Sequence, residues 1–304
     1  MIVLLAALGL IGGGLWLYAP DKPRAALEAQ YAQPPSEFLQ IAGIRLHVRD
    51  TGPRDAPPVI LLHGFGSSLL TWEPWARSLS YTHRVIRYDL PGFGLTGADP
   101  TKDYLDERGV EVLGALMDRL DVKRASLVGN SMGGKVAWMF AAEYPDRVDR
   151  LVLISPDGFA SPQFPYGRKQ DVPLVAELLP YTLPTVMLRL TLDPAYGDQK
   201  RLTPEIVQRY RDMILAPGVR QAVLDRTAQV MPQPPGPMLR HVHAPTLLVW
   251  GEKDGVIPFR KAGDYLAAMP NARLLVFPDL GHVPMEEAPA RSLPPVEAFL
   301  DGSL

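Results

Sequence analysis

The sequence predicts an α/β fold, with a mostly parallel eight-stranded sheet, flanking helices and one helical insertion. Short β-branched runs alternate with amphipathic stretches along most of the chain. From Val59 onward the candidate strands are nearly continuous apolar runs, as expected when parallel crossovers bury both faces of a sheet. Between residues 159 and 243 this alternation stops, and proline-separated helical patterns replace it.

The expected strands are short and are bounded by Gly, Pro and Asp. The first two flank Gly43 and predict a hairpin. The strands are expected at Glu37–Ala42, Arg45–Arg49, Val59–Leu62, Arg84–Tyr88, Ala125–Val128, Leu151–Ile154, Thr246–Trp250 and Arg273–Phe277.

Helical periodicity fills the gaps between these strands. Helices are expected at Trp72–Ser80, Tyr104–Leu120, Met132–Tyr144, Phe259–Met269 and Glu286–Leu300. The insertion offers Val172–Leu179, Pro184–Leu190, Pro204–Leu215 and Val219–Gln229. We therefore expect a core from residues 37–158 and 244–304, and a helical cap over residues 159–243, where an insertion usually covers a site.

Composition narrows the possible functions. A chain of 304 residues with 47% hydrophobic residues and a formal net charge of −2 is typical of one large globular domain without a polyanionic partner, so nucleic acid is not expected. The chain has no cysteine, which excludes disulfides, thiolate metal sites and cysteine nucleophiles.

The amino end is apolar. No charged residue occurs from Met1 to Tyr18, a length that as a helix approaches the thickness of a bilayer. Because no basic residue precedes this run, residues 1–18 predict an uncleaved membrane anchor rather than a cleaved signal peptide. Residues 19–36 are expected to be a linker. This interpretation implies a membrane-anchored protein of a bacterial inner-membrane type, with a secreted or periplasmic protein as the alternative.

A candidate nucleophile lies where a strand meets a helix. Residues 129–133 read Gly-Asn-Ser-Met-Gly, which fits G-x-S-x-G directly after an apolar run and before a helical pattern. The small residues allow a sharp turn that projects the hydroxyl of Ser131 above the sheet. The competing interpretation is a serine that only caps the following helix.

A serine nucleophile needs a base and a group that orients the base. Of six histidines, His282 lies in a loop just after the last expected strand. Asp254 follows the preceding strand, and the order nucleophile, acid, histidine matches the G-x-S-x-G pattern. Asp157, which follows the Leu151–Ile154 strand, is an alternative acid.

An acyl-transfer site also needs donors for an oxyanion. The run His63-Gly-Phe-Gly ends the Val59–Leu62 strand, and the main-chain N–H groups of Phe65 and Met132 are the expected donors. On this interpretation His63 braces the loop and is not a base.

One motif is misleading. Residues 92–97 match G-x-G-x-x-G, but Asp99 and Pro100 interrupt any helix that could open there, so a nucleotide site is not expected. The sequence contains no H-E-x-x-H or similar metal motif. We therefore expect neither a cofactor nor a metal.

With these residues in hand, the chain from about Glu37 to Leu300 resembles the α/β-hydrolase superfamily. The matches are His63-Gly-Phe-Gly, Tyr88-Asp-Leu-Pro-Gly-Phe-Gly, Gly129-Asn-Ser-Met-Gly-Gly, Tyr144-Pro-Asp-Arg-Val and Gly281-His. The nucleophile segment looks like those of bacterial esterases and lipases and of carbon–carbon hydrolases that act on ring-fission products. The second group usually carries Trp after the catalytic histidine, where this chain has Val283.

The resemblance therefore implies a serine esterase or lipase that acts on a small-molecule or lipid-like ester through an acyl-enzyme. A carbon–carbon bond hydrolase and a non-catalytic binding protein of the same fold are the alternatives. Many Leu and Met residues between 178 and 231 pack the insertion or line a cleft for an acyl chain.

Overall fold

The computed structural model describes residues 17–161 and 165–303, and its central feature is a sheet with the order β1-β2-β4-β3-β5-β6-β7-β8. β2 runs antiparallel to β1 and β4, and every other pairing is parallel. The predicted mostly parallel eight-stranded sheet is thus confirmed. The strands are β1 (Ser36–Ile41), β2 (Ile44–Thr51), β3 (Pro58–Leu62), β4 (Arg84–Tyr88), β5 (Ala125–Asn130), β6 (Val148–Ile154), β7 (Thr246–Gly251) and β8 (Ala272–Phe277).

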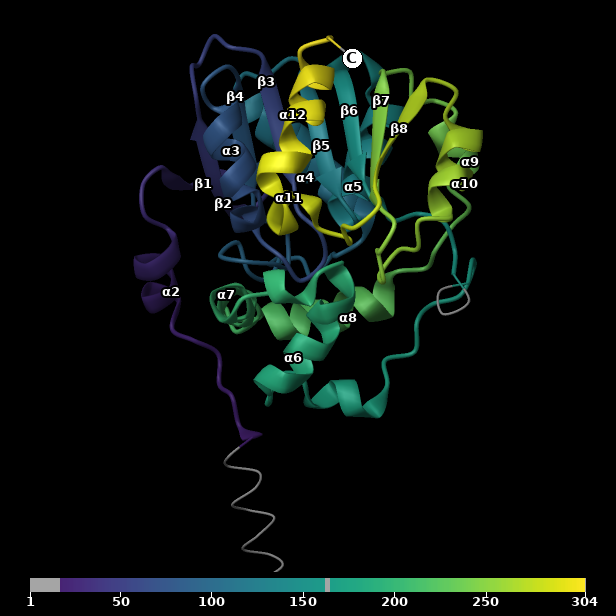
Figure 1. Ribbon diagram of the computed structural model, residues 1–304. Coiled ribbons are helices and arrows are strands. Elements are labelled where there is room, and N and C mark those ends of the chain that lie inside the picture. Colours follow the sequence, from purple (N-terminus) through teal and green to yellow (C-terminus); the bar gives the residue numbers. More distant parts are fainter. Residues whose placement is uncertain (1–16, 162–164, 304) are drawn as a thin grey trace, which may run out of the picture.

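Both faces of the sheet are covered, which explains the apolar strands (Figure 1). Within β3, Ile60 and Leu62 join one core cluster, and Val59 and Leu61 join the other, because successive side chains point to opposite faces. The first face packs on α4 (Asp106–Arg119), α5 (Met132–Glu143) and α10 (Lys261–Ala268). The second packs on α3 (Glu73–Leu79) and α12 (Pro289–Leu300). The short 3-10 helices η1 (Leu69–Trp72) and η2 (Pro145–Arg147) precede α3 and β6.

The C-terminal helical region differs from the single expected helix. The structure has α11 (Pro284–Glu287) followed by α12, with a break at Ala288. Ala288 has φ −147° and ψ 62°, because the ring of the following Pro289 disfavours helical backbone at the residue before it.

The segment between β6 and β7 forms a helical layer below the sheet (Figure 1). Its longer helices pack on one another and on the core. Its elements are η3 (Leu174–Leu178), α6 (Thr185–Leu192), η4 (Asp193–Ala195), η5 (Gln199–Arg201), α7 (Pro204–Ile214), α8 (Val219–Gln229) and α9 (Gly236–Leu239).

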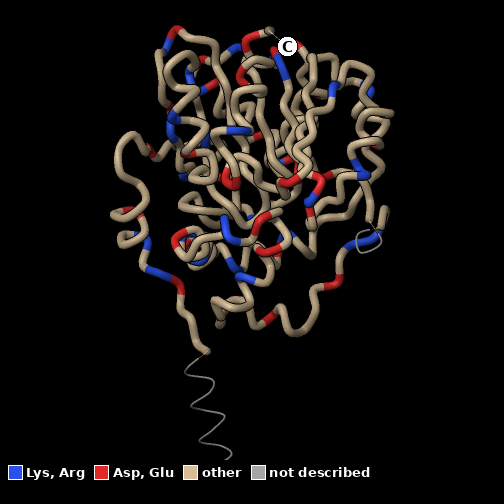
Figure 2. The backbone as a smooth tube through the Cα atoms, viewed as in Figure 1, with Lys and Arg blue, Asp and Glu red and all other residues tan. Residues whose placement is uncertain are grey.

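Residues 19–36, expected to be a linker, instead pack against the insertion. Tyr18 forms a β-bridge with Thr182, and the N–H of Ala19 donates to the carbonyl of Tyr181 at 2.9 Å. Helix α2 (Arg24–Tyr31) follows and buries Leu27. Figure 2 shows basic and acidic positions close together along this segment. Two of them, Asp21 and Lys22, form ion pairs with α8 and α7.

The predicted anchor falls mainly on residues 1–16, which lie outside the described residues. Within residues 17–161 and 165–303, no helix is both long and apolar enough to cross a bilayer. This finding contradicts the predicted membrane-anchored localisation. The N–H groups of Ala19 and Lys22 donate to the carbonyls of Tyr181 and Leu215 in the insertion, so these two main-chain groups are satisfied by protein.

Candidate active site

Ser131 occupies a strained turn between β5 and α5. Its backbone has φ 54° and ψ −119°, a conformation that L residues rarely adopt. The turn depends on glycine, because a Cβ at Gly129 would lie 2.4 Å from the carbonyl oxygen of Gly133. The Ser131 side chain makes no capping hydrogen bond to α5. The hydroxyl is therefore not engaged as a helix cap and is available for chemistry.

His282 and Asp254 lie together after β8 and β7. The Nδ1 of His282 is 2.8 Å from Oδ2 of Asp254, and both side chains are buried. The other carboxylate oxygen, Oδ1, accepts the N–H groups of Val256 and Ile257, each at 2.8 Å. With both oxygens occupied, Asp254 is held in one orientation and directs the imidazole ring.

Asn130 links the His282 loop to the turn that carries Ser131. Its Nδ2 donates to the carbonyl of His282 at 3.0 Å and to that of Ile154 at 3.1 Å. The residue that precedes Ser131 thereby holds the backbone of His282. In the G-x-S-x-G pattern this position is variable, so the motif did not point to Asn130. The one sequence signal for its role was an amide side chain at the end of an apolar strand.

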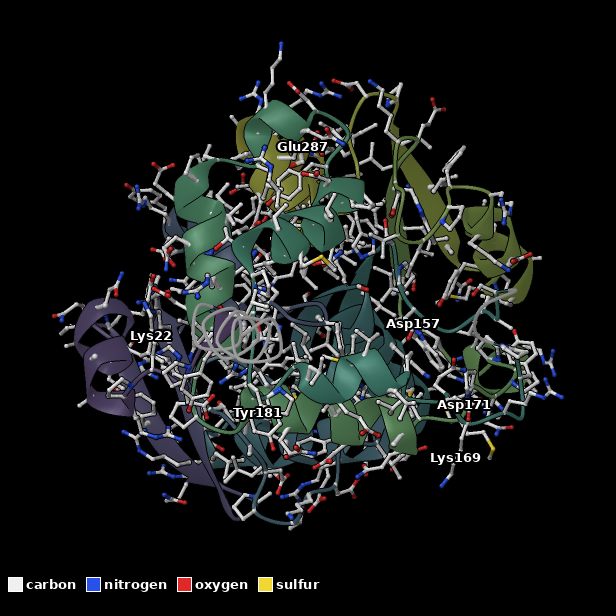
Figure 3. All side chains as sticks on the ribbon, turned by 90° about the horizontal axis from the view of Figure 1, so that it is seen from below. Lys22, Asp157, Lys169, Asp171, Tyr181 and Glu287 are labelled. Atoms are coloured by element: carbon white, nitrogen blue, oxygen red, sulfur yellow. The ribbon has the colours of Figure 1, made fainter. Side chains whose placement is uncertain are left out.

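Asp157, the alternative acid, has a different environment. Its described hydrogen bonds are made by its main chain: its N–H donates to the carbonyl of Ser131 at 3.0 Å, and its carbonyl accepts from Trp138 and Tyr265. Figure 3 places it apart from Glu287, which lies near His282 along the chain. The structure brings Asp254, rather than Asp157, to the imidazole.

The loop after β3 lies against Ser131. A Cβ on Gly64 would lie 2.9 Å from Oδ1 of Asn130 and 3.2 Å from the Cβ of Ser131, closer than ordinary contact, so glycine favours this approach. The Nδ1 of His63 is 2.8 Å from the carbonyl of Gly64, and its Nε2 accepts the N–H of Leu90 at 2.9 Å. His63 is therefore the Nδ1–H tautomer, and burial lowers its pKa against the opposing effect of Asp89.

The hydrogen bond between His63 and the carbonyl of Gly64 orients the N–H of Phe65, a candidate oxyanion donor. The carbonyl of Gly64 and the N–H of Phe65 belong to one planar trans peptide, so they point in opposite directions. Holding the carbonyl against His63 fixes the direction of the Phe65 N–H. The second candidate donor, Met132, is buried at the start of α5.

Two cavities among the described residues are lined by neither Ser131 nor His282. One of about 20 Å³ lies behind Met132 and Val136, with room for a single water. One of about 620 Å³ is an open groove between α2 and α7. Within the described ranges, no group of three or more His, Cys, Asp or Glu residues could hold a metal ion.

A mostly parallel sheet with a serine at the turn after β5, an acid after β7 and a histidine after β8 defines the class of protein. The family model described as alpha/beta hydrolase fold matches residues 57–289. The chain belongs to the α/β-hydrolase family.

Curated relatives with named activities include two bacterial enzymes. A 2-hydroxy-6-oxononadienedioate/2-hydroxy-6-oxononatrienedioate hydrolase of Comamonas testosteroni is 32% identical over 254 residues, covering 80% of this chain and 86% of the relative. A 2-hydroxy-6-oxo-6-phenylhexa-2,4-dienoate hydrolase of Burkholderia cepacia is 32% identical over 255 residues, with the same coverage.

Solved structures extend the comparison. A membrane phospholipase A described as a bacterial virulence factor is 26% identical with a TM-score of 0.75, covering 99% of this chain and 97% of that one. The meta-cleavage product hydrolase from Pseudomonas fluorescens IP01 is 27% identical with a TM-score of 0.75, covering 88% and 98%. These likenesses support a hydrolase that acts on a small molecule.

Proposed function

We propose that this chain is a serine hydrolase that cleaves carboxylic esters. The observation that carries the proposal is Ser131 on a strained turn, tied through Asn130 to a histidine that Asp254 orients. A serine hydroxyl is a weak nucleophile, and such a base makes it reactive.

In the proposed mechanism, His282 accepts the proton of Ser131 as the hydroxyl attacks the ester carbonyl. The resulting oxyanion accepts hydrogen bonds from the N–H groups of Phe65 and Met132, each worth about 3 kcal/mol in the transition state. His282 then returns the proton to the leaving alcohol, which leaves an acyl-enzyme on Ser131. Water, deprotonated by the same histidine, attacks the acyl carbon and releases the acid and the free serine.

Two features favour esters over the carbon–carbon bond hydrolysis of the dienoate relatives. The names of those relatives describe anionic substrates, and a buried carboxylate requires a cation. Arg209 of the insertion forms an ion pair with Glu286, which lies four residues after His282. Because Glu286 already meets its charge, this cation is not free to bind a substrate carboxylate. Val283 also stands where carbon–carbon hydrolases usually carry Trp, and it is buried. The likeness to the phospholipase A over 99% of this chain adds support.

The apolar residues of the insertion divide into two groups. Leu183, Leu188 and Met213 are buried in clusters that join the insertion to the core or to the amino-terminal segment, whereas Leu178, Met187 and Leu190 are more than half exposed. The second group is a source of apolar surface for an acyl chain, so we propose that medium or long acyl esters are better substrates than acetates.

The test is labelling with a fluorophosphonate probe, together with hydrolysis of p-nitrophenyl esters from acetate to laurate. We expect the wild type to label and Ser131→Ala to lose both labelling and activity. Failure of the wild type to label contradicts the serine-hydrolase proposal. A strict preference for acetate contradicts the acyl-chain proposal.

The second candidate, a carbon–carbon hydrolase, is favoured by the two relatives at 32% identity. It predicts loss of the ultraviolet absorbance of a 2-hydroxy-6-oxo-dienoate. Faster turnover of that compound than of every ester tested would replace the ester proposal with this one.

A further inference from the structure

Glu287 is a buried acid close to His282 that the proposed mechanism does not use. It lies at the end of α11, five residues after the histidine, and only 2% of it is exposed. Both of its carboxylate oxygens accept main-chain N–H groups. Oε2 accepts from Gly281 at 2.7 Å, and Oε1 accepts from Asp198 at 2.8 Å.

The two donors belong to segments that are far apart in the sequence. Gly281 directly precedes His282, whereas Asp198 lies in the insertion, at the end of residues 194–198, which we call the clamp segment. Glu287 therefore bridges the histidine loop and the insertion at one point.

The clamp segment also contacts both loops of the acid–histidine pair. The N–H of His282 donates to the carbonyl of Ala195 at 2.7 Å. The N–H of Gly255, which follows Asp254, donates to the carbonyl of Pro194 at 3.0 Å. One short piece of the insertion is thus hydrogen-bonded to the loop of the base and to the loop of the acid.

The contact between these segments is made by backbone. A Cβ at Gly281 would lie 2.5 Å from the carbonyl oxygen of Ala195, and one at Gly197 would lie 2.4 Å from that of Asp279. Because the chains touch without intervening side chains, a small displacement of the clamp segment moves His282 directly.

Moving a carboxylate from water into the protein interior costs free energy unless hydrogen bonds or a counter-charge compensate it, so a buried glutamate is expected to have a specific role. Among the described residues, Glu287 forms no ion pair within 4 Å; two N–H groups meet its charge instead. A glutamine of the same shape has one acceptor oxygen, and its NH₂ group would face an N–H. Only a carboxylate accepts from both segments at once.

We propose that Glu287 is a positioning residue, which holds the clamp segment on the His282 loop and so keeps the imidazole aligned with Asp254 and Ser131. It touches neither substrate nor reacting atoms. The proposal rests on the proposed function, because alignment of this histidine matters only where it acts as the base.

The test compares Glu287→Gln with Glu111→Gln, a matched change at a mostly exposed glutamate of α4. In Glu287→Gln we expect kcat for ester hydrolysis to fall about 10- to 100-fold with KM within about threefold, since a misplacement near 1 Å has effects of this size. We also expect the downfield proton resonance of the hydrogen bond between His282 Nδ1 and Asp254 to shift or broaden. Glu111→Gln is expected to match the wild type in both measurements.

Unchanged kcat and an unchanged resonance in Glu287→Gln overturn the proposal, as does a loss of thermal stability with neither effect. If Glu287→Gln does not fold, Glu287→Asp serves the same purpose. It keeps the charge but is too short to reach both donors, and wild-type kcat and resonance in this variant overturn the proposal. If the wild type neither labels with fluorophosphonate nor cleaves esters, the proposed function fails. The proton resonance of the hydrogen bond between His282 and Asp254 can be measured without substrate, so it still tests whether Glu287 keeps these two side chains aligned.

Discussion

At the scale of single residues, the site is held by amides and backbone more than by charges. The Asn130 amide joins the end of β6 to the His282 loop by donating to the carbonyls of Ile154 and His282. His63 fixes the peptide that carries the Phe65 N–H. Both side chains are nearly fully buried, and neither is a reacting group in the proposed mechanism.

We predict that Asn130→Ala lowers kcat for ester hydrolysis by about 5- to 100-fold. Loss of the amide leaves the carbonyl of His282 without this donor, at about 1–3 kcal/mol for an unsatisfied buried group, and removes this hold on the His282 backbone. The carbonyl of Ile154 still accepts the N–H of Ser131. Steady-state kinetics measures the effect. Asn271→Ala is the control, because the Asn271 amide donates to His243 in an exposed loop. Equal kcat in Asn130→Ala and the wild type would contradict this role.

At the scale of elements, Asp106 at the start of α4 joins three helices. Its carboxylate is 2.7 Å from Nζ of Lys135 on α5 and 2.5 Å from Nη2 of Arg226 on α8. Burial raises the pKa of Asp106, but Arg226 and Lys135 lower it further, to about 2 from an ordinary value of 3.8. This cluster joins the insertion to α4 and to α5, the helix that begins directly after Ser131.

The depressed pKa predicts a pH-dependent contribution to stability. Because the folded pKa lies below the unfolded one, the contribution is complete above about pH 4 and disappears as the pH falls through about 2. Its size is about 2 kcal/mol, because a tenfold difference in proton affinity between the folded and unfolded protein corresponds to about 1.4 kcal/mol.

Urea unfolding of the wild type and Asp106→Asn at several pH values tests this contribution. We expect the variant to be less stable at pH 7 and the difference to shrink by about 2 kcal/mol between pH 4 and pH 2. A difference that is constant over this range would contradict the assignment.

At the scale of the whole molecule, the amino-terminal segment joins the core to the insertion. Lys22 is 2.6 Å from buried Asp212 on α7, and Asp21 is 2.6 Å from Arg220 on α8. Leu27 of α2 packs in one cluster with residues of the core loops and of the insertion, namely Leu69, Leu70, Leu95, Met213, Ala216 and Val219. The folded structure of the amino-terminal segment therefore depends on contacts with both the core and the insertion.

We predict that Leu27→Ala lowers the free energy of unfolding by about 2–4 kcal/mol, because Leu27 is only 1% exposed and its loss leaves a cavity at this junction. Leu266→Ala is the control on α10, where the side chain is 37% exposed, and we expect it to cost less than about 1 kcal/mol. Urea denaturation measures both. Equal effects of the two substitutions would show that α2 does not pack at this junction in solution.

Several elements were predictable because their signals are local. Apolar runs bounded by turn residues located the strands, and G-x-S-x-G located the turn at Ser131. The amphipathic pattern of α2 was missed, since eight residues between prolines are a weak signal and the helix is stabilised by the burial of Leu27. The single helix expected at Glu286–Leu300 is two, because Pro289 restricts the residue before it.

By itself, the sequence determined the α/β class, the position of Ser131 and the order in which candidate acid and base follow it, because periodicity and chain order are local properties. Only the tertiary structure decided that Asp254 rather than Asp157 meets His282, that Asn130 holds the histidine backbone and that Glu287 joins this loop to the insertion. Each of these contacts joins segments between 28 and 152 residues apart. Their existence depends on how buried groups find hydrogen-bond partners once the sheet and the insertion have packed together.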